Sequence, residues 1–119
     1  MQNLMVLDTQ KFWENFRELK HLVPSLMASF VKQCPGSLAR IEAAISAGDA
    51  AALKSAAHAY KGVLLQIYAP RSGALAEDLE RRGRTGSTEG AREIYDQLVV
   101  EIDLLLSAIQ NLDHEKNAA

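Results

Sequence analysis

The chain has 119 residues, with 13 lysines and arginines, 15 aspartates and glutamates, and a formal net charge of -2. This length suits one domain with its own core, residues 1–119, and the balanced charge gives no basis for nucleic-acid binding. The only cysteine, Cys34, excludes an intrachain disulfide and a cysteine zinc site, and favours a reducing compartment. No apolar stretch approaches the roughly 20 residues of a membrane span, and residues 1–7 lack the basic start of a secretion signal. We therefore expect a cytoplasmic domain.

Apolar residues recur at intervals of three and four along the chain, which predicts helices rather than strands. Asp8 or Thr9 can cap a first short helix, and Pro24 can open a second helix that ends at Gly48. Pro35 falls inside this second helix. Because proline lacks an amide donor and clashes with the preceding turn, we expect it to kink or split the helix.

A third helix follows the capping residue Asp49 and carries one apolar stripe at helical spacing. The stripe consists of Leu53, Ala57, Tyr60, Leu64 and Ile67. Pro70 then opens a fourth helix, which ends at Gly83 after a basic last turn. Both helices are amphipathic, so each is expected to bury one face against the others.

The last helix is expected to begin near Ser87 or Thr88 and to fray after Asn111 into a polar tail, residues 113–119. Amphipathic helices joined by short turns predict an all-α fold. We expect an antiparallel four-helix bundle with its core over about residues 20–112. The additional short N-terminal helix is expected to lie across one end of this bundle.

A polar patch interrupts the apolar pattern of the third helix. At about 100° per residue, His58 lies about 140° from the centre of the apolar stripe, so it is expected to face solvent or a partner. Lys61 and Gly62 follow three and four positions later, on the same surface. A glycine inside a helix costs about 1 kcal/mol relative to alanine, which the close approach of another molecule would justify. Lys54 and Leu65 lie around His58 on this side and are expected to contact a docked partner.

The patch has the groups needed to carry a phosphoryl group. Neutral imidazole is a nucleophile near physiological pH, because the reference pKa of histidine is about 6.5. The ammonium of Lys61, one turn on, can stabilise the negative charge of the product, and Gly62 removes a side chain that would obstruct the approach. The chain has no glycine loop for phosphate and no paired carboxylates for a metal on this face, so it is not a self-sufficient enzyme.

The segment AHAYKG, residues 57–62, resembles the signature of histidine-containing phosphotransfer (HPt) domains, the shuttles of bacterial-type phosphorelays. The family motif is a histidine preceded by alanine, with lysine three and glycine four positions later. The resemblance covers most of residues 20–112 and is strongest over 48–83. It includes the pairs Gly48-Asp49 upstream and Leu79-Glu80 downstream.

The resemblance implies a four-helix bundle that carries phosphate but has no kinase activity. By this resemblance, His58 is the phosphoacceptor, Lys61 neutralises the phosphoryl charge and Gly62 gives access. Gln66 is a further candidate for contact with the phosphate. The partners would be receiver domains of response regulators or of a hybrid sensor histidine kinase. No cofactor is implied, since the magnesium ion belongs to the receiver. We expect a monomer, and the initial methionine and the polar tail favour a free-standing protein.

Three departures from the family pattern favour an alternative hypothesis. Val63, Leu64 and Leu65 stand where the family prefers small residues, Tyr68 stands in place of a glycine, and Ser72 in place of a leucine. A degenerate HPt-like adaptor would bind receiver or kinase domains without transferring phosphate. The sequence leaves open the identity of the partners, the direction of phosphoryl flow and the imidazole nitrogen that reacts.

Other polar residues are interpreted without a functional role. His21 and His114 lack the neighbours that distinguish His58, so both are expected to be incidental. Glu77, Asp78 and Glu80 alternate with arginines and predict a solvated helix face. No histidine–glutamate pair at metal-ligand spacing and no serine–histidine–aspartate arrangement supports a metal or hydrolytic enzyme.

Overall fold

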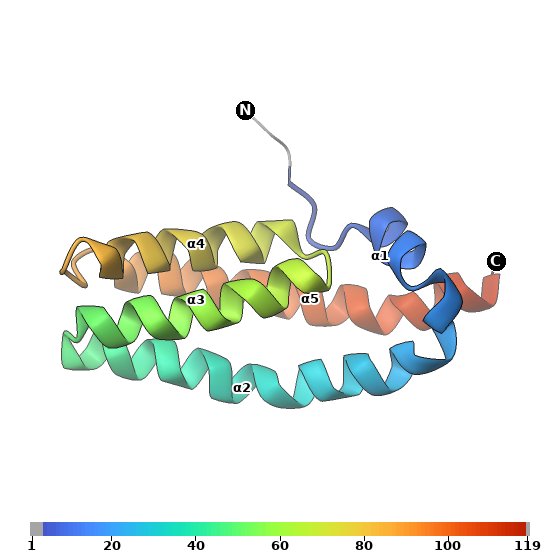
Figure 1. Ribbon diagram of the computed structural model, residues 1–119, viewed down its shortest axis with the longest axis horizontal. Helices are drawn as coiled ribbons and strands as arrows, with labels where there is room; N and C mark the ends of the chain where they lie inside the picture. Colours follow the sequence, from blue (N-terminus) through green and yellow to red (C-terminus); the bar gives the residue numbers. More distant parts are fainter. Residues whose placement is uncertain (1–3, 119) are drawn as a thin grey trace.

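The computed structural model describes the backbone of residues 4–118 and the side chains of residues 4–112. Four long helices run antiparallel to one another, and the described residues contain no strand (Figure 1). The elements are α1 (Thr9–Asn15), a 3-10 helix η1 (Arg17–Leu22), α2 (Val23–Ala47), α3 (Ala50–Gln66), α4 (Pro70–Arg84) and α5 (Ala91–Ala118). The expected all-α four-helix bundle with a short N-terminal helix is confirmed.

The junction between α2 and α3 has the end signals that the sequence predicts. Gly48 ends α2 in the left-handed conformation with a φ of 65°, which glycine adopts at no steric cost. The carboxylate of Asp49 accepts a hydrogen bond of 3.0 Å from the backbone N–H of Ala52, and so caps α3. These caps fix the start of α3, and therefore which of its faces is buried.

Pro35 lies inside an unbroken α2, and the last helix differs from the expected one at both of its ends. Pro35 does not split α2, which continues from Val23 to Ala47. The Pro35 side chain is exposed, so the hydrogen bond that proline cannot donate is missing at the surface and not in the core. The last helix begins at Ala91, later than expected, because Gly90 has a φ of 80° and ends a turn. It also continues to Ala118 rather than fraying after Asn111, and no glycine or proline interrupts it there.

The core lies between the four long helices. The stripe predicted for α3 is confirmed, since its five residues are all at least 95% buried. They pack with apolar side chains from the other helices, of which the largest fully buried ones are Phe12, Ile41, Leu79, Leu98, Ile102, Leu105 and Leu112. The opposite surface of α3, including His58, is therefore turned away from the core.

Helices α3 and α4 approach each other closely because α4 carries two buried glycines. A Cβ atom added to Gly83 would lie 2.6 Å from the backbone nitrogen of Lys54 and 2.7 Å from the carbonyl oxygen of Ala50. A Cβ atom added to Gly73 would lie 2.6 Å from Cδ2 of Leu65. Side chains at either position would push the helices apart. This close pairing sets the position of α4 side chains relative to the exposed face of α3.

The N-terminal segment packs against the end of the bundle where α3 turns into α4, as expected (Figure 1). The N–H of Asp8 donates to the carbonyl of Tyr68 over 2.7 Å, and the N–H of Arg71 donates to the carbonyl of Met5 over 3.1 Å. Tyr68 has a φ of 64°, in the left-handed region that costs a side chain about 1–2 kcal/mol. This conformation explains why a glycine would suit position 68. The Tyr68 side chain packs against the core, which offsets the strain.

Replacing Ser72 with alanine is expected to stabilise the fold. Ser72 is fully buried in α4, and its Oγ has no hydrogen-bond partner. An unsatisfied buried hydroxyl costs about 1–3 kcal/mol, which the alanine would recover. We expect the free energy of unfolding, measured by urea denaturation, to rise by about 1 kcal/mol more than in Ser107→Ala. Ser107 is an exposed serine on α5, so that variant reports helix propensity alone. Equal effects of the two substitutions would contradict the assignment.

Candidate functional site

The His58 side chain projects from α3 into solvent and is anchored at one ring nitrogen. Its exposed fraction is 67%, and Nδ1 lies 3.1 Å from Oε2 of Glu80 on α4. A carboxylate can only accept a hydrogen bond, so Nδ1 carries the proton. In the neutral ring, Nε2 then holds the free lone pair. The expected outward orientation of His58 is confirmed.

Glu80 is the buried centre of the site, and the expectation that it belongs to a solvated face was wrong. Its side chain is only 5% exposed, whereas those of Glu77 and Asp78 are 40% and 45% exposed. The reason is its position on α4, four residues after buried Ala76 and three before buried Gly83, on the face that meets α3. The sequence signal for this role was the leucine–glutamate pair of the family resemblance.

Three cationic or hydrogen-bonding groups surround the Glu80 carboxylate. Besides His58, Lys61 Nζ lies 2.7 Å from Oε1 and Arg84 Nη2 lies 2.7 Å from Oε2. The ion pair with Lys61 is the main cause that lowers the pKa of Glu80 below its usual range; burial opposes this and the His58 contact adds to it. Glu80 is therefore a carboxylate at neutral pH and keeps accepting from Nδ1.

The Lys61 ammonium is paired with two carboxylates of α4. Its Nζ also lies 2.9 Å from Oε2 of Glu77, and its side chain is 19% exposed. The hydrogen bond to Glu80, followed by that to Glu77, raises the pKa of Lys61. The ammonium is thus a permanent cation on the His58 side of the bundle, held beside the carboxylate that His58 contacts.

The other residues singled out in the sequence all lie on the exposed side of α3. A Cβ atom added to Gly62 would meet nothing within 4 Å, so packing inside this chain does not require a glycine there. Lys54 and Gln66 are exposed, and Leu65 is exposed by 48% although its tip covers Gly73. These residues flank His58 along α3.

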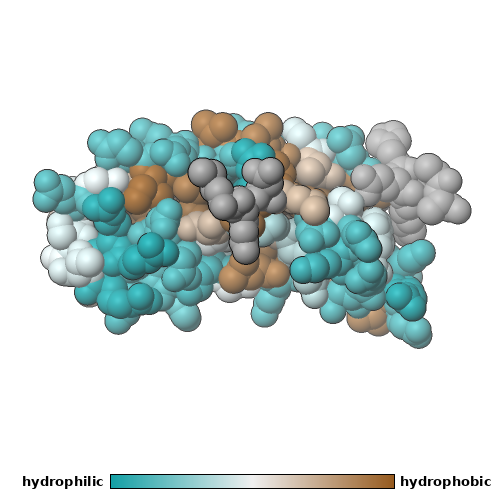
Figure 2. Space-filling model, turned by 90° about the horizontal axis from the view of Figure 1, so that it is seen from above, coloured by the Kyte–Doolittle hydropathy of each residue, from teal (hydrophilic) through white to brown (hydrophobic). Residues whose placement is uncertain are grey.

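The surface around the site is mainly polar. Seen from above, hydrophilic residues predominate over the C-terminal part of α4, and apolar residues gather nearer the middle of the molecule (Figure 2). Within residues 4–112, no group of three or more histidine, cysteine, aspartate or glutamate side chains is arranged to hold a metal ion. None of the helices described here has the length and hydropathy to cross a membrane.

Replacing Glu80 with glutamine is expected to destabilise the protein in a pH-dependent way. The substitution leaves Lys61 without its buried partner charge, so we expect a lower unfolding free energy than in wild type at pH 7. Because folding lowers the pKa of Glu80, its contribution is present above about pH 4.5, the ordinary glutamate value, and is lost as the pH falls through the folded-state value. The difference in unfolding free energy between wild type and Glu80→Gln should therefore be smaller at pH 3 than at pH 7.

Glu89→Gln provides the matched control, since Glu89 is exposed in the turn between α4 and α5. It should change the unfolding free energy by less than about 0.5 kcal/mol at either pH. A Glu80→Gln variant as stable as wild type at pH 7 would show that the buried carboxylate contributes nothing to the fold.

Comparison with known proteins gives the family. A sequence profile of the Hpt domain matches residues 25–112, which include all of α3 and α4. The fold is similar to the crystal structure of histidine-containing phosphotransfer protein B (HptB) from Pseudomonas aeruginosa PAO1. The TM-score is 0.87 at 24% identity, with 95% of this chain and 98% of that chain covered. A search of curated protein sequences returned no match. Since the family profile covers most of the chain and the bundle has the same architecture, the chain belongs to the Hpt domain family and is a histidine phosphotransfer protein of phosphorelay signalling.

Proposed function

We propose that His58 accepts a phosphoryl group from the aspartyl phosphate of one receiver domain and passes it to the aspartate of another. The observation that carries this proposal is the anchored, outward-facing ring. Nδ1 is held by a buried carboxylate, and the side chain is 67% exposed, so a second protein can reach Nε2. The protein would act as a phosphocarrier without kinase activity of its own.

In the proposed step, the Nε2 lone pair forms a bond to phosphorus as the bond from phosphorus to the aspartate oxygen breaks. The electron pair of that bond leaves with the receiver carboxylate. Nδ1 keeps its proton, so positive charge develops on the imidazole ring. The carboxylate of Glu80, 3.1 Å from Nδ1, stabilises this charge and also fixes the orientation of the ring. Reversal of the same step delivers the phosphoryl group to the next receiver.

Lys61, Gly62 and Gln66 would support the phosphoryl group. The Lys61 ammonium would neutralise phosphoryl oxygens, and to do so it would exchange part of its contact with Glu77 or Glu80. Gly62 would leave room for the incoming aspartyl phosphate, in keeping with the open space where its Cβ atom would lie. Exposed Gln66, two turns after His58, would offer an amide hydrogen bond.

The receiver would supply the magnesium ion and bind over the exposed face of α3. Lys54 and Leu65 are the proposed docking contacts on either side of His58. A lysine and an exposed leucine are suited to the polar rim and the apolar centre of a transient protein interface.

The direct test is to locate the phosphoryl group. The protein would be incubated with magnesium and candidate receiver domains that have been phosphorylated with acetyl phosphate. We expect label that is labile in acid and stable in base, mapped to His58 by mass spectrometry and to Nε2 by 15N NMR. Label on another residue, or receivers that bind but lose phosphate only to water, would overturn the proposal.

A receiver-binding adaptor is the second candidate, because the Lys61 ammonium is already paired with two carboxylates. Exposed Val63 and Leu65 would then provide binding without chemistry. This function predicts that receiver affinity is the same for wild type and for a variant lacking His58, and that neither protein takes up phosphate.

A further inference from the structure

Arg84 and His58 contact the same carboxylate oxygen of Glu80. Arg84 Nη2 lies 2.7 Å from Oε2 of Glu80, the atom that also lies 3.1 Å from His58 Nδ1. Arg84 is four residues after Glu80, so it lies one turn further along the same face of α4. Its side chain is about half exposed and reaches back to the buried carboxylate.

The charges around His58 balance because of Arg84. On α4, the carboxylates of Glu77 and Glu80 face the site, and on α3 the nearest cations along the helix are Lys61 and exposed Lys54. Lys61 contacts both carboxylates, so one of the two negative charges is left for Arg84. The other charged groups nearby are directed elsewhere. They are Asp78 and Arg81, which pair with each other on α4, and Arg40 of α2, which lines the groove beyond Ala59.

A buried carboxylate beside a histidine has two opposing effects. It orients the ring and fixes the tautomer, but it also favours the doubly protonated imidazolium, which has no lone pair for phosphorus. An arginine on the same oxygen remains charged at every physiological pH, and it reduces the second effect without removing the hydrogen bond to Nδ1.

We propose that Arg84 is a positioning residue of the phosphotransfer site, which neutralises the oxygen of Glu80 that His58 contacts and so keeps Nε2 unprotonated. This inference rests on the proposed function of His58. The site would then have two cations. Arg84 on α4 acts through Glu80, and Lys61 on α3 lies one turn after His58.

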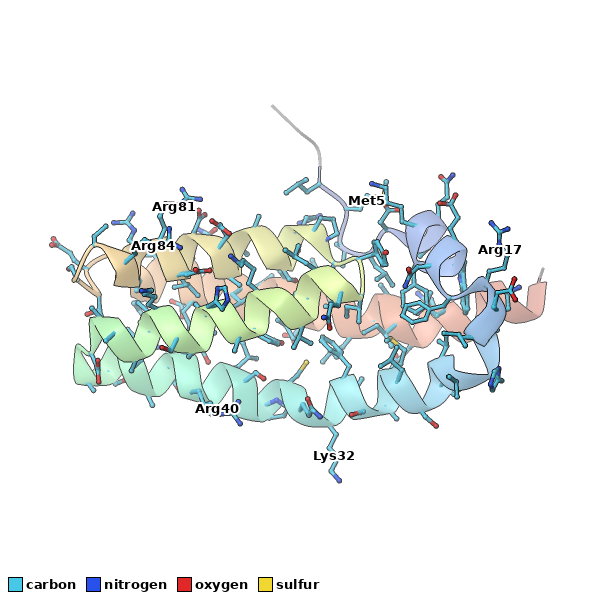
Figure 3. All side chains as sticks on the ribbon, viewed as in Figure 1. Met5, Arg17, Lys32, Arg40, Arg81 and Arg84 are labelled. Atoms are coloured by element: carbon cyan, nitrogen blue, oxygen red, sulfur yellow. The ribbon has the colours of Figure 1, made fainter. Side chains whose placement is uncertain are left out.

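The test compares Arg84→Gln with Arg81→Gln by NMR titration of the His58 ring in the full chain. Both arginines come from the C-terminal part of α4 (Figure 3), both are exposed, and both variants lose one positive charge. Only Arg84 contacts Glu80. We expect the titration midpoint of His58 to be higher in Arg84→Gln than in wild type, and to change clearly less in Arg81→Gln. Arg84→Lys should restore most of the wild-type midpoint.

Phosphoryl uptake gives the second readout. The pH profile of the uptake rate should move to higher pH in Arg84→Gln, in the same direction as the titration midpoint. A midpoint equal to that of Arg81→Gln would overturn the proposal. The titration does not require phosphotransfer, so absence of uptake in wild type would instead contradict the function of His58.

Discussion

Replacing His58 with glutamine is expected to abolish phosphoryl uptake from phosphorylated receiver domains. The amide nitrogen of glutamine is not a nucleophile, and no other group in the site offers a free lone pair on nitrogen, because Lys61 and Arg84 are paired cations. We expect the uptake rate to fall by more than about a hundredfold. The fold should survive, since the His58 side chain is 67% exposed and surface substitutions change stability by about 0.5 kcal/mol or less.

His21→Gln is the matched control for this experiment. His21 is also exposed, but it lies in η1 and has no contact with the site. Uptake of labelled phosphate by His21→Gln should equal that of wild type, with both variants unfolding at the same urea concentration as wild type within error. Labelling of His58→Gln at the wild-type rate would show that the phosphoacceptor is elsewhere. Receiver binding measured in parallel separates the carrier from the adaptor.

The sequence contained enough local information to predict α3 and its orientation. Asp49 caps the helix, and its five apolar residues recur at helical spacing, so the side on which His58 lies follows from geometry. The charge pattern could not reveal Glu80. Its burial depends on how closely α4 approaches α3, which is a tertiary property set by Gly73 and Gly83.

Two local features also depended on contacts that are distant in sequence. Tyr68 occupies a left-handed conformation that a glycine would suit, and packing of its side chain against the core offsets the strain. Pro35 would break an isolated helix, yet α2 continues through it because residues on both sides pack into the bundle, among them Phe30, Cys34 and Ile41. In both cases tertiary packing overrides the local preference of the residue.

Gly83→Ala and Gly62→Ala are expected to change stability in opposite directions, although both add one methyl group to a helix. At Gly62 the new Cβ atom meets nothing within 4 Å, so helix propensity should raise the unfolding free energy by about 1 kcal/mol. At Gly83 it would lie 2.6 Å from the backbone nitrogen of Lys54, and backbone cannot rotate away as a side chain can. Overpacking of this kind costs about 1–3 kcal/mol or more, which exceeds the gain in propensity.

The same pair of variants connects helix packing to the chemistry of the site. Glu80 lies three residues before Gly83, so a displacement of α4 at Gly83 also moves the carboxylate away from His58 Nδ1. Urea denaturation should show Gly83→Ala less stable than wild type by about 2 kcal/mol, and its His58 ring should lose the Nδ1–H tautomer preference in 15N NMR. Gly62→Ala should keep that preference and yet take up phosphate more slowly, because its methyl group would occupy the open space through which a receiver is proposed to approach. If Gly83→Ala were as stable as wild type, the close contact of α3 and α4 would not be what holds Glu80 beside the histidine.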